Sequence, residues 1–82
     1  MKKIHIVDDD SNIVESLEIV LKKEGFSCSS QCDDNNVVEN VLKVGADLVI
    51  LDVIFPEDDS AGFKIARELK KDDRTSKIPI LM

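Results

Sequence analysis

The hydrophobic and polar positions change their period along the chain, and these periods predict strands and helices in alternation. Residues 3–7 are short, β-branched and followed by acidic residues, which favours a strand. The next segment, 11–23, has apolar residues at the spacing of one helical face, namely Ile13, Val14, Leu17, Val20 and Leu21. Gly25 then fits the end of a helix, because glycine adopts a left-handed conformation without cost. The first quarter of the chain therefore predicts a strand and then a helix.

The following segment repeats this order with weaker signals. Residues 26–30 predict a more polar strand near the edge of a sheet. Asp33 or Asp34 can cap a second helix that ends at Gly45, and its apolar face comprises Val37, Val38, Val41 and Leu42.

The clearest strand is 47–52, because its four consecutive aliphatic residues indicate burial on both faces, as in a central parallel strand. The acidic, small-residue segment 57–62 predicts a surface loop. A third helix follows, with Phe63, Ile65, Ala66 and Leu69 inward. Residues 78–82 predict the start of a fourth buried strand, with Pro79 near its entry.

Alternating strands and helices are typical of the α/β class, with a doubly wound parallel sheet and right-handed crossovers. In such sheets the functional crevice lies at the carboxyl ends of the strands. Asp8, Asp9 and Asp10 end the first strand, and Asp52 ends the third. If these strands are neighbours, spaced by about 4.8 Å, their carboxylates converge within the reach of one metal ion.

Clustered carboxylates repel one another unless a proton or a cation joins them, and Mg²⁺ prefers such oxygen ligands. Asp52 can then act as a nucleophile that forms an aspartyl phosphate. A structural alternative stays open for the first group, since Asp8 to Asp10 can also cap the first helix. The acidic residues 57–59 fit a solvated loop better than a ligand set.

Composition narrows the class of protein. The 82 residues fit at most one domain, and 43% apolar with 34% charged residues is typical of a soluble globular chain. The net charge of −6 argues against a nucleic-acid surface, and no apolar run is long enough to span a membrane, so we expect a cytoplasmic protein. Cys28 and Cys32 are expected to be reduced, and His5 is the only histidine available for a zinc site.

Three blocks of the sequence resemble the receiver domain of two-component response regulators. Residues 4–10 resemble the family's strand that ends in an acidic pair, and 47–56 resemble the strand with the phosphorylated aspartate and a proline four residues later. Residues 73–80 resemble the approach to the fourth strand. The blocks occur in the family's order and spacing over the whole chain.

This resemblance implies a flavodoxin-like sheet of order 2-1-3-4-5, here with strands one to four and helices one to three. It implies that Asp52 is phosphorylated by a sensor histidine kinase or a phosphotransfer protein. Asp9, Asp52 and the backbone carbonyl of Ile54 would bind Mg²⁺ directly, and Asp8 would act through a water. The domain would be a phosphoprotein in signalling and not a conventional enzyme. The family docks its kinase on the first helix, where Ile19 is a candidate contact.

The chain departs from the family in two places. Gly62 lies six residues after Pro56, where the family has about four, so the loop between them is expected to be longer. The chain also stops before the family's Ser or Thr after the fourth strand and its later lysine. Residues 1–82 thus resemble the N-terminal two-thirds of one receiver domain. The fourth strand would be an exposed apolar edge, which predicts a homodimer or strand exchange.

Two other functions remain to be weighed. One is a receiver-like protein-binding module that is not phosphorylated. The other is a phosphatase of the haloacid dehalogenase type, because Asp8 and Asp10 form an Asp-x-Asp after the first strand. That reading leaves Asp52 unexplained, so the receiver interpretation is preferred.

Overall fold

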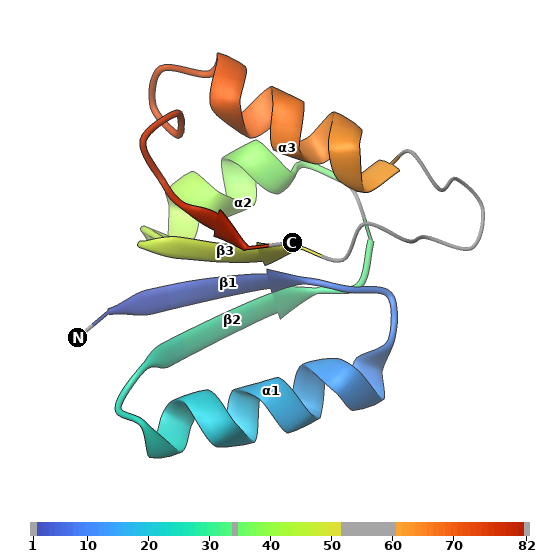
Figure 1. Cartoon of the computed structure of the whole chain (residues 1–82), viewed down its shortest axis with the longest axis vertical. Helices are drawn as coiled ribbons and strands as arrows, with labels where there is room; N and C mark the ends of the chain where they lie inside the picture. The colour runs from blue at the N-terminus through green and yellow to red at the C-terminus, as the bar shows by residue number, and fades with distance from the viewer. Residues whose placement is uncertain (1, 34, 52–60, 82) are drawn as a thin grey trace.

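A computed structural model describes residues 2–33, 35–51 and 61–81 of the chain. Strands and helices alternate as the sequence predicts (Figure 1). The elements are β1 (Lys3–Val7), α1 (Ser11–Lys23), β2 (Ser27–Gln31), α2 (Val37–Val44), β3 (Leu48–Leu51), α3 (Ala61–Lys71) and β4 (Ile80–Leu81).

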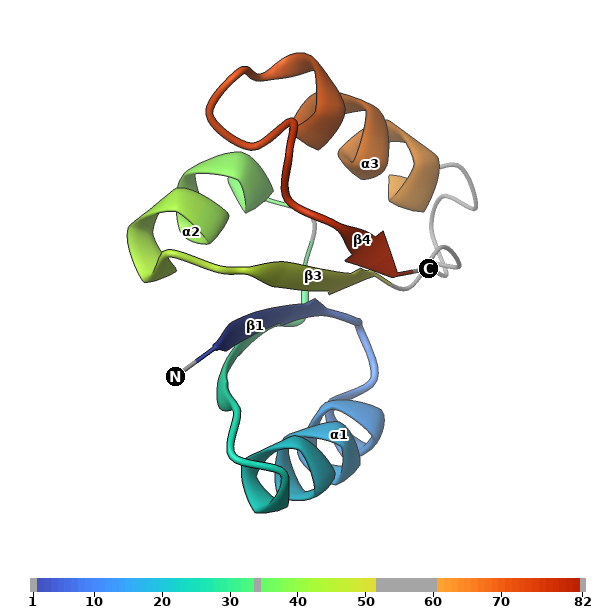
Figure 2. The same cartoon turned by 60° about the vertical axis from the view of Figure 1, so that its left-hand side comes forward.

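The strands form one sheet of order β2-β1-β3-β4, and each pairing between neighbours is parallel. This confirms the predicted α/β class and the order of the first four strands. Helix α1 covers one face of the sheet, while α2 and α3 lie on the other (Figures 1 and 2). Strand β1 is central because it pairs with both β2 and β3.

The strand side chains alternate between two apolar cores. On the α1 face, Ile4, Ile6 and Val14 are buried, with Leu17 and Leu21 packed against them. The core on the α2 and α3 face is larger and comprises Val7, Val37, Val41, Ala46, Val49, Leu51, Ile65 and Leu69. Both faces of β3 therefore contact apolar residues, which confirms that it is a central strand.

Helix α1 has the predicted bounds but a narrower buried face than predicted. Val14 is buried, whereas Ile13 is 48% exposed and Val20 is 57% exposed. These two residues are seven positions apart and so share one flank of the helix. No part of the chain that the structure describes covers that flank.

Helix α2 begins later than the sequence predicts. Its N-cap is Asn36, in the left-handed region at φ 55°, and this residue makes no side-chain capping bond. The predicted cap at Asp33 is wrong, and Asp34 lies outside the described residues. The end of the helix is as predicted, since Gly45 follows Val44 with φ 67°.

The segment from α3 to β4 is held by a buried hydroxyl group. Thr75 is fully buried, and its Oγ1 donates to the backbone carbonyl of Leu69 at 2.6 Å. Strand β4 then joins the sheet, where the carbonyl of Pro79 accepts the N–H of Val49 at 3.0 Å. The predicted loop 57–62 is wrong at its end, because Ala61 and Gly62 belong to α3; residues 57–60 lie outside the described residues.

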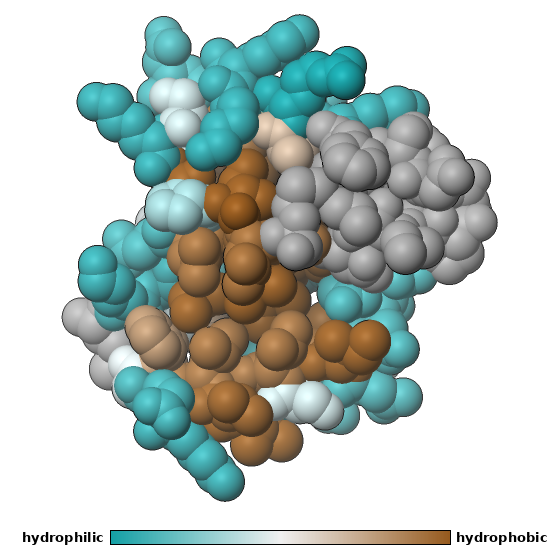
Figure 3. All heavy atoms as spheres, in the orientation of Figure 1, coloured by the Kyte–Doolittle hydropathy of each residue, from teal (hydrophilic) through white to brown (hydrophobic). Residues whose placement is uncertain are grey.

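Apolar residues gather on one side of the molecule, in an area that extends over the strands toward α1 (Figure 3). The exposed large apolar residues of the described chain are Ile13, Ile19, Val20 and Leu81. Among the described residues, no helix is both long and apolar enough to cross a membrane.

Candidate functional site at the carboxyl ends of the strands

Asp8 lies at the carboxyl end of the central strand β1. It is only 7% exposed, which is unusual for a carboxylate and indicates a specific environment. Its Oδ1 accepts the backbone N–H of Asp10 at 2.9 Å. The backbone N–H of Asp8 donates to the carbonyl of Gln31 at 3.2 Å, which ties the end of β1 to the end of β2.

The three aspartates after β1 have different surroundings. Asp10 is exposed, and its side chain caps α1 by accepting the N–H groups of Asn12 and Ile13 at 2.9 and 3.4 Å. The capping role that the sequence left open therefore applies to Asp10. Asp9 is half-buried and Asp8 is buried, and the N-cap of α1 is Asp10. These two carboxylates remain as candidate ligands.

The neighbouring strand β3 reaches the same edge of the sheet. The parallel register pairs Val7 with Leu51, so Asp8 follows the end of one strand beside the end of the other. In the sequence, Leu51 is followed by Asp52. Asp52 and Ile54 lie outside the described residues, so their predicted roles stay predictions.

The donor set at this edge suits a hard cation. Carboxylate oxygens are the ligands that Mg²⁺ prefers, and Mg²⁺ sites commonly use only one or two carboxylates besides water and phosphate oxygens. The described residues alone contain no group of three or more His, Cys, Asp or Glu that could hold a metal ion.

The two cysteines are free thiols, as predicted. Cys28 is half-buried on β2 and Cys32 is exposed. Burial raises the pKa of the Cys28 thiol, with a smaller contribution from Glu18. Cys28 is therefore protonated at neutral pH, and a protonated thiol is a poor metal ligand and a poor nucleophile.

One polar cluster beneath α2 was not found from the sequence. His5 is 3% exposed, and its two ring nitrogens lie 2.8 Å from Ser29 Oγ and 2.8 Å from Gln31 Oε1. The available signal was the alternation of polar residues on β2, which places Ser27, Ser29 and Gln31 on one face. In the parallel register Ser29 lies beside His5.

A doubly wound parallel sheet with buried carboxylate at its carboxyl edge defines a class of α/β proteins. Within that class, the chain belongs to the response regulator receiver domain family, whose model matches residues 4–82. Receiver domains are signalling modules of response regulators.

Solved structures of this family superpose closely on the chain. The N-terminal domain of a response regulator receiver protein from Methanoculleus marisnigri is 28% identical with a TM-score of 0.88, and the alignment covers 100% of this chain and 65% of that one. The response regulator TrrA from Thermotoga maritima, in complex with Mg²⁺-BeF, is 32% identical with a TM-score of 0.78, covering 90% and 63%. The same regulator in complex with the histidine kinase ThkA is 31% identical with a TM-score of 0.81, covering 98% and 66%.

The chain thus spans slightly less than two thirds of the length of these three structures.

Proposed function

We propose that the chain is a phosphoacceptor, in which Asp52 takes a phosphoryl group from a histidine kinase or phosphotransfer protein in a Mg²⁺-dependent reaction. The observation that carries the proposal is the buried carboxylate of Asp8 at the edge where β1 and β3 end side by side. The family match over 4–82 and the Mg²⁺-BeF complex of TrrA support it.

In such a site, different residues of the chain would bind the metal ion and accept the phosphoryl group. Asp9 and Asp52, with the carbonyl of Ile54, would hold Mg²⁺, and Asp8 would act through a water. The carboxylate of Asp52 attacks phosphorus as the bond to the donor's leaving group breaks, which gives an aspartyl phosphate. When bound, Mg²⁺ neutralises charge on the transferring group.

The partner is proposed to dock beside the site on α1. TrrA, which is similar over 98% of this chain, has been solved with the kinase ThkA. Ile19 is 59% exposed on α1, as a contact residue must be, and Ile13 and Val20 are exposed on the same helix. A protein-binding module that is not phosphorylated is the alternative, and the buried Asp8 favours the phosphoacceptor over it.

The metal site can be tested by nuclear magnetic resonance (NMR), with Mg²⁺ and then beryllium fluoride added to the ¹⁵N-labelled chain. Beryllium fluoride is an anion similar in shape to a phosphoryl group. We expect saturable shifts of the Asp8 and Asp9 amides, with binding weakened at least about tenfold in Asp9→Asn, or about 1.4 kcal/mol. The matched control is Asp73→Asn, an exposed aspartate in the segment after α3. Equal weakening by both variants would show that only net charge matters and would refute the site.

A further inference from the structure

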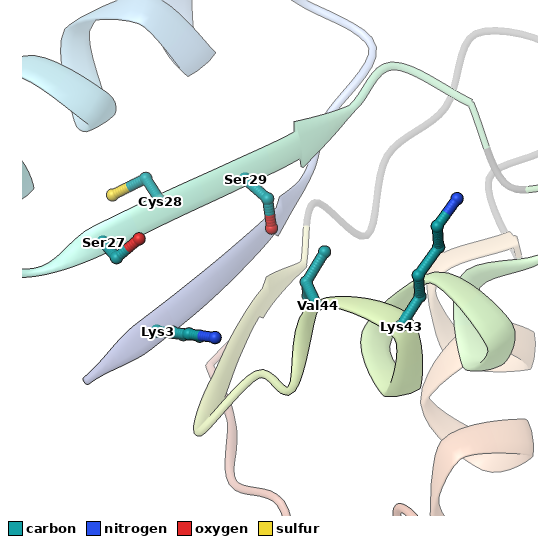
Figure 4. A pocket seen from close by; sticks show the side chains of 6 residues that line it. All are labelled: Lys3, Ser27, Cys28, Ser29, Lys43 and Val44. Atoms are coloured by element: carbon teal, nitrogen blue, oxygen red, sulfur yellow. The ribbon is translucent and has the colours of Figure 1, made fainter. Parts of the chain in front are cut away.

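A second polar site lies on the α2 face of the sheet, away from the carboxyl edge. A pocket of about 310 Å³ opens between the edge strand β2, the beginning of β1 and the last turn of α2. Its lining residues are Lys3, Ser27, Cys28, Ser29, Lys43 and Val44 (Figure 4). Figure 4 shows the Ser29 hydroxyl and the Lys3 ammonium directed into this space, while the Cys28 thiol points to the opposite side of β2.

The lining carries two cations and no acidic residue, although the chain as a whole has a net charge of −6. Asp47 is bonded to the beginning of β1, where its Oδ2 accepts the backbone N–H of Lys3 at 2.9 Å. The C-terminal end of a helix disfavours an anion, and Lys43 in the last turn of α2 offsets that effect. Serine hydroxyls add donors that can be aimed at an oxyanion.

The Ser29 hydroxyl also contacts the buried imidazole behind the pocket. Ser29 Oγ lies 2.8 Å from His5 Nδ1, and His5 Nε2 lies 2.8 Å from Gln31 Oε1. The amide nitrogen of Gln31 donates to the carbonyls of Asp33 and Asn35 at 2.9 and 3.0 Å. This fixes which end of the Gln31 amide faces His5.

The orientation of the Gln31 amide determines which atoms carry hydrogens in the series of hydrogen bonds from Gln31 through His5 to Ser29. Gln31 Oε1 can only accept, and it also accepts from Asn40 Nδ2 at 3.0 Å, so His5 Nε2 must carry a hydrogen. In the neutral ring, His5 Nδ1 is then an acceptor, and the Ser29 hydroxyl donates to it. The single hydrogen of Ser29 is therefore committed to His5 when the pocket holds no anion.

We propose that this pocket binds a small oxyanion, such as a sulfate or phosphate group, and that binding is coupled to the uptake of one proton by His5. An oxyanion that accepts the Ser29 hydrogen leaves the lone pairs of Ser29 Oγ facing His5 Nδ1. That repulsion is removed when Nδ1 gains a proton and donates to Ser29. The Nε2 hydrogen bond to Gln31 is unchanged by this step.

The charges around His5 favour the coupling. The register neighbour on β3 is the apolar Val49, so that strand adds no charge. The charged groups on the surrounding elements are Lys3 of β1, Asp33 after β2, Glu39 and Lys43 of α2, and Asp47 before β3. Glu39 is paired with Arg74 at 3.3 Å, Asp47 accepts the backbone N–H of Lys3, and Asp33 accepts from the Gln31 amide. The charged residues that line the pocket itself are the two lysines. An anion bound between these lysines would place a negative charge beside His5, which favours an imidazolium.

Sulfate is the probe of choice, because it stays a dianion over the pH range in which histidine titrates. It would be titrated into the ¹⁵N-labelled 82-residue chain without Mg²⁺, at constant ionic strength set with NaCl. We expect saturable shifts of the Lys3, Ser27, Ser29 and Val44 amides, with sulfate binding more tightly than acetate because sulfate carries two negative charges and the lining includes two lysines. Shifts that stay linear in sulfate, or acetate binding as tightly as sulfate, would overturn the site.

Charge-matched variants separate a pocket from a general surface effect. Lys3→Gln and Lys43→Gln should each weaken sulfate binding about tenfold, whereas Lys23→Gln, which removes an exposed lysine from the end of α1, should leave it unchanged. Equal weakening in all three variants would refute the pocket.

The proton coupling has its own readout, since His5 is the only histidine and its ring ¹⁵N signals are unambiguous. Sulfate should move them to the doubly protonated pattern, and the affinity for sulfate should fall as the pH rises. Ser29→Ala should remove that pH dependence, with amide dispersion showing that the variant is folded. Wild-type binding that is independent of pH would refute the coupling. Neither outcome depends on Asp52, so this proposal stands or fails separately from the proposed function.

Discussion

The backbone N–H of Asp10 donates to Oδ1 of Asp8 at 2.9 Å, inside one turn at the end of β1. This bond orients a carboxylate that is 7% exposed, while the side chain of Asp10 itself turns back to cap α1. Two aspartates that look equivalent in the sequence therefore have different roles. Asp10 stabilises the helix, and Asp8 belongs to the candidate site.

Replacing Asp10 should separate these two roles. Asp10→Ala removes an N-cap and should lower the free energy of unfolding by about 1 kcal/mol in urea denaturation, whereas Asp10→Ser should retain most of it. Both variants keep the backbone N–H that Asp8 accepts, so the Mg²⁺-induced amide shifts at Asp8 and Asp9 should persist. Loss of those shifts in folded Asp10→Ser would show that Asp10 is itself a ligand.

The ion pair between Asp72 and Arg74 predicts that the stability of the fold depends on pH in strong acid. The side-chain hydrogen bond from Arg74, and then its backbone N–H, lower the pKa of Asp72 from 3.8 to about 2. Because the folded pKa lies below the unfolded one, the stabilisation is present above about pH 4 and is lost as the pH falls through about 2.

Arg74→Gln should therefore raise the pKa of Asp72 measured by ¹³C NMR, though not fully to 3.8, because the backbone N–H at 2.9 Å remains. Arg67→Gln, on the exposed side of α3, is the matched control and should leave the pKa of Asp72 unchanged. An unaltered Asp72 titration in Arg74→Gln would show that the pair does not form.

The two thiols should react at different rates. Cys28 is half-buried, and burial raises its pKa, so little thiolate is present at neutral pH. Cys32 is exposed. We expect iodoacetamide to label Cys32 first, with Cys32→Ser alkylated more slowly than Cys28→Ser when followed by intact mass. The reverse order would mean that β2 opens more readily than its packing indicates.

Strand β4 is the end strand of the described sheet, and Leu81 is 58% exposed on it. An apolar edge strand can pair with another chain, so the 82-residue chain should self-associate with rising concentration in light scattering. Leu81→Lys should reduce that association, because a charged edge disfavours pairing. Ile19→Lys, which alters an exposed apolar residue on α1, should not; a stable monomer over a wide concentration range would contradict the prediction.

The elements were predictable where periodicity and burial agree. The bounds of β1 and α1, the central position of β3 and the end of α2 at Gly45 all follow from local sequence. The start of α2 could not be predicted from local sequence, because Asn36 adopts a left-handed conformation that no neighbouring residue indicates. The exposure of Ile13 and Val20 also depends on which elements pack against α1, and a single helix's pattern does not contain that information.

The candidate site was predictable only where it follows from the order of the strands. Parallel topology brings the ends of β1 and β3 to one edge, so the sequence alone places Asp8 there. Its burial and the capping role of Asp10 depend on backbone geometry within one turn. The His5 cluster was missed because it arises from the register between β1 and β2, which sequence spacing does not fix.

The most direct test of the central claim is phosphorylation of Asp52. The chain and its Asp52→Ala variant would be treated with acetyl phosphate and Mg²⁺ and compared by intact mass. We expect the wild-type chain to gain one phosphoryl group that is lost when Mg²⁺ is withheld, and the variant to gain none. Equal labelling of the two proteins, or no labelling of either, would contradict the account.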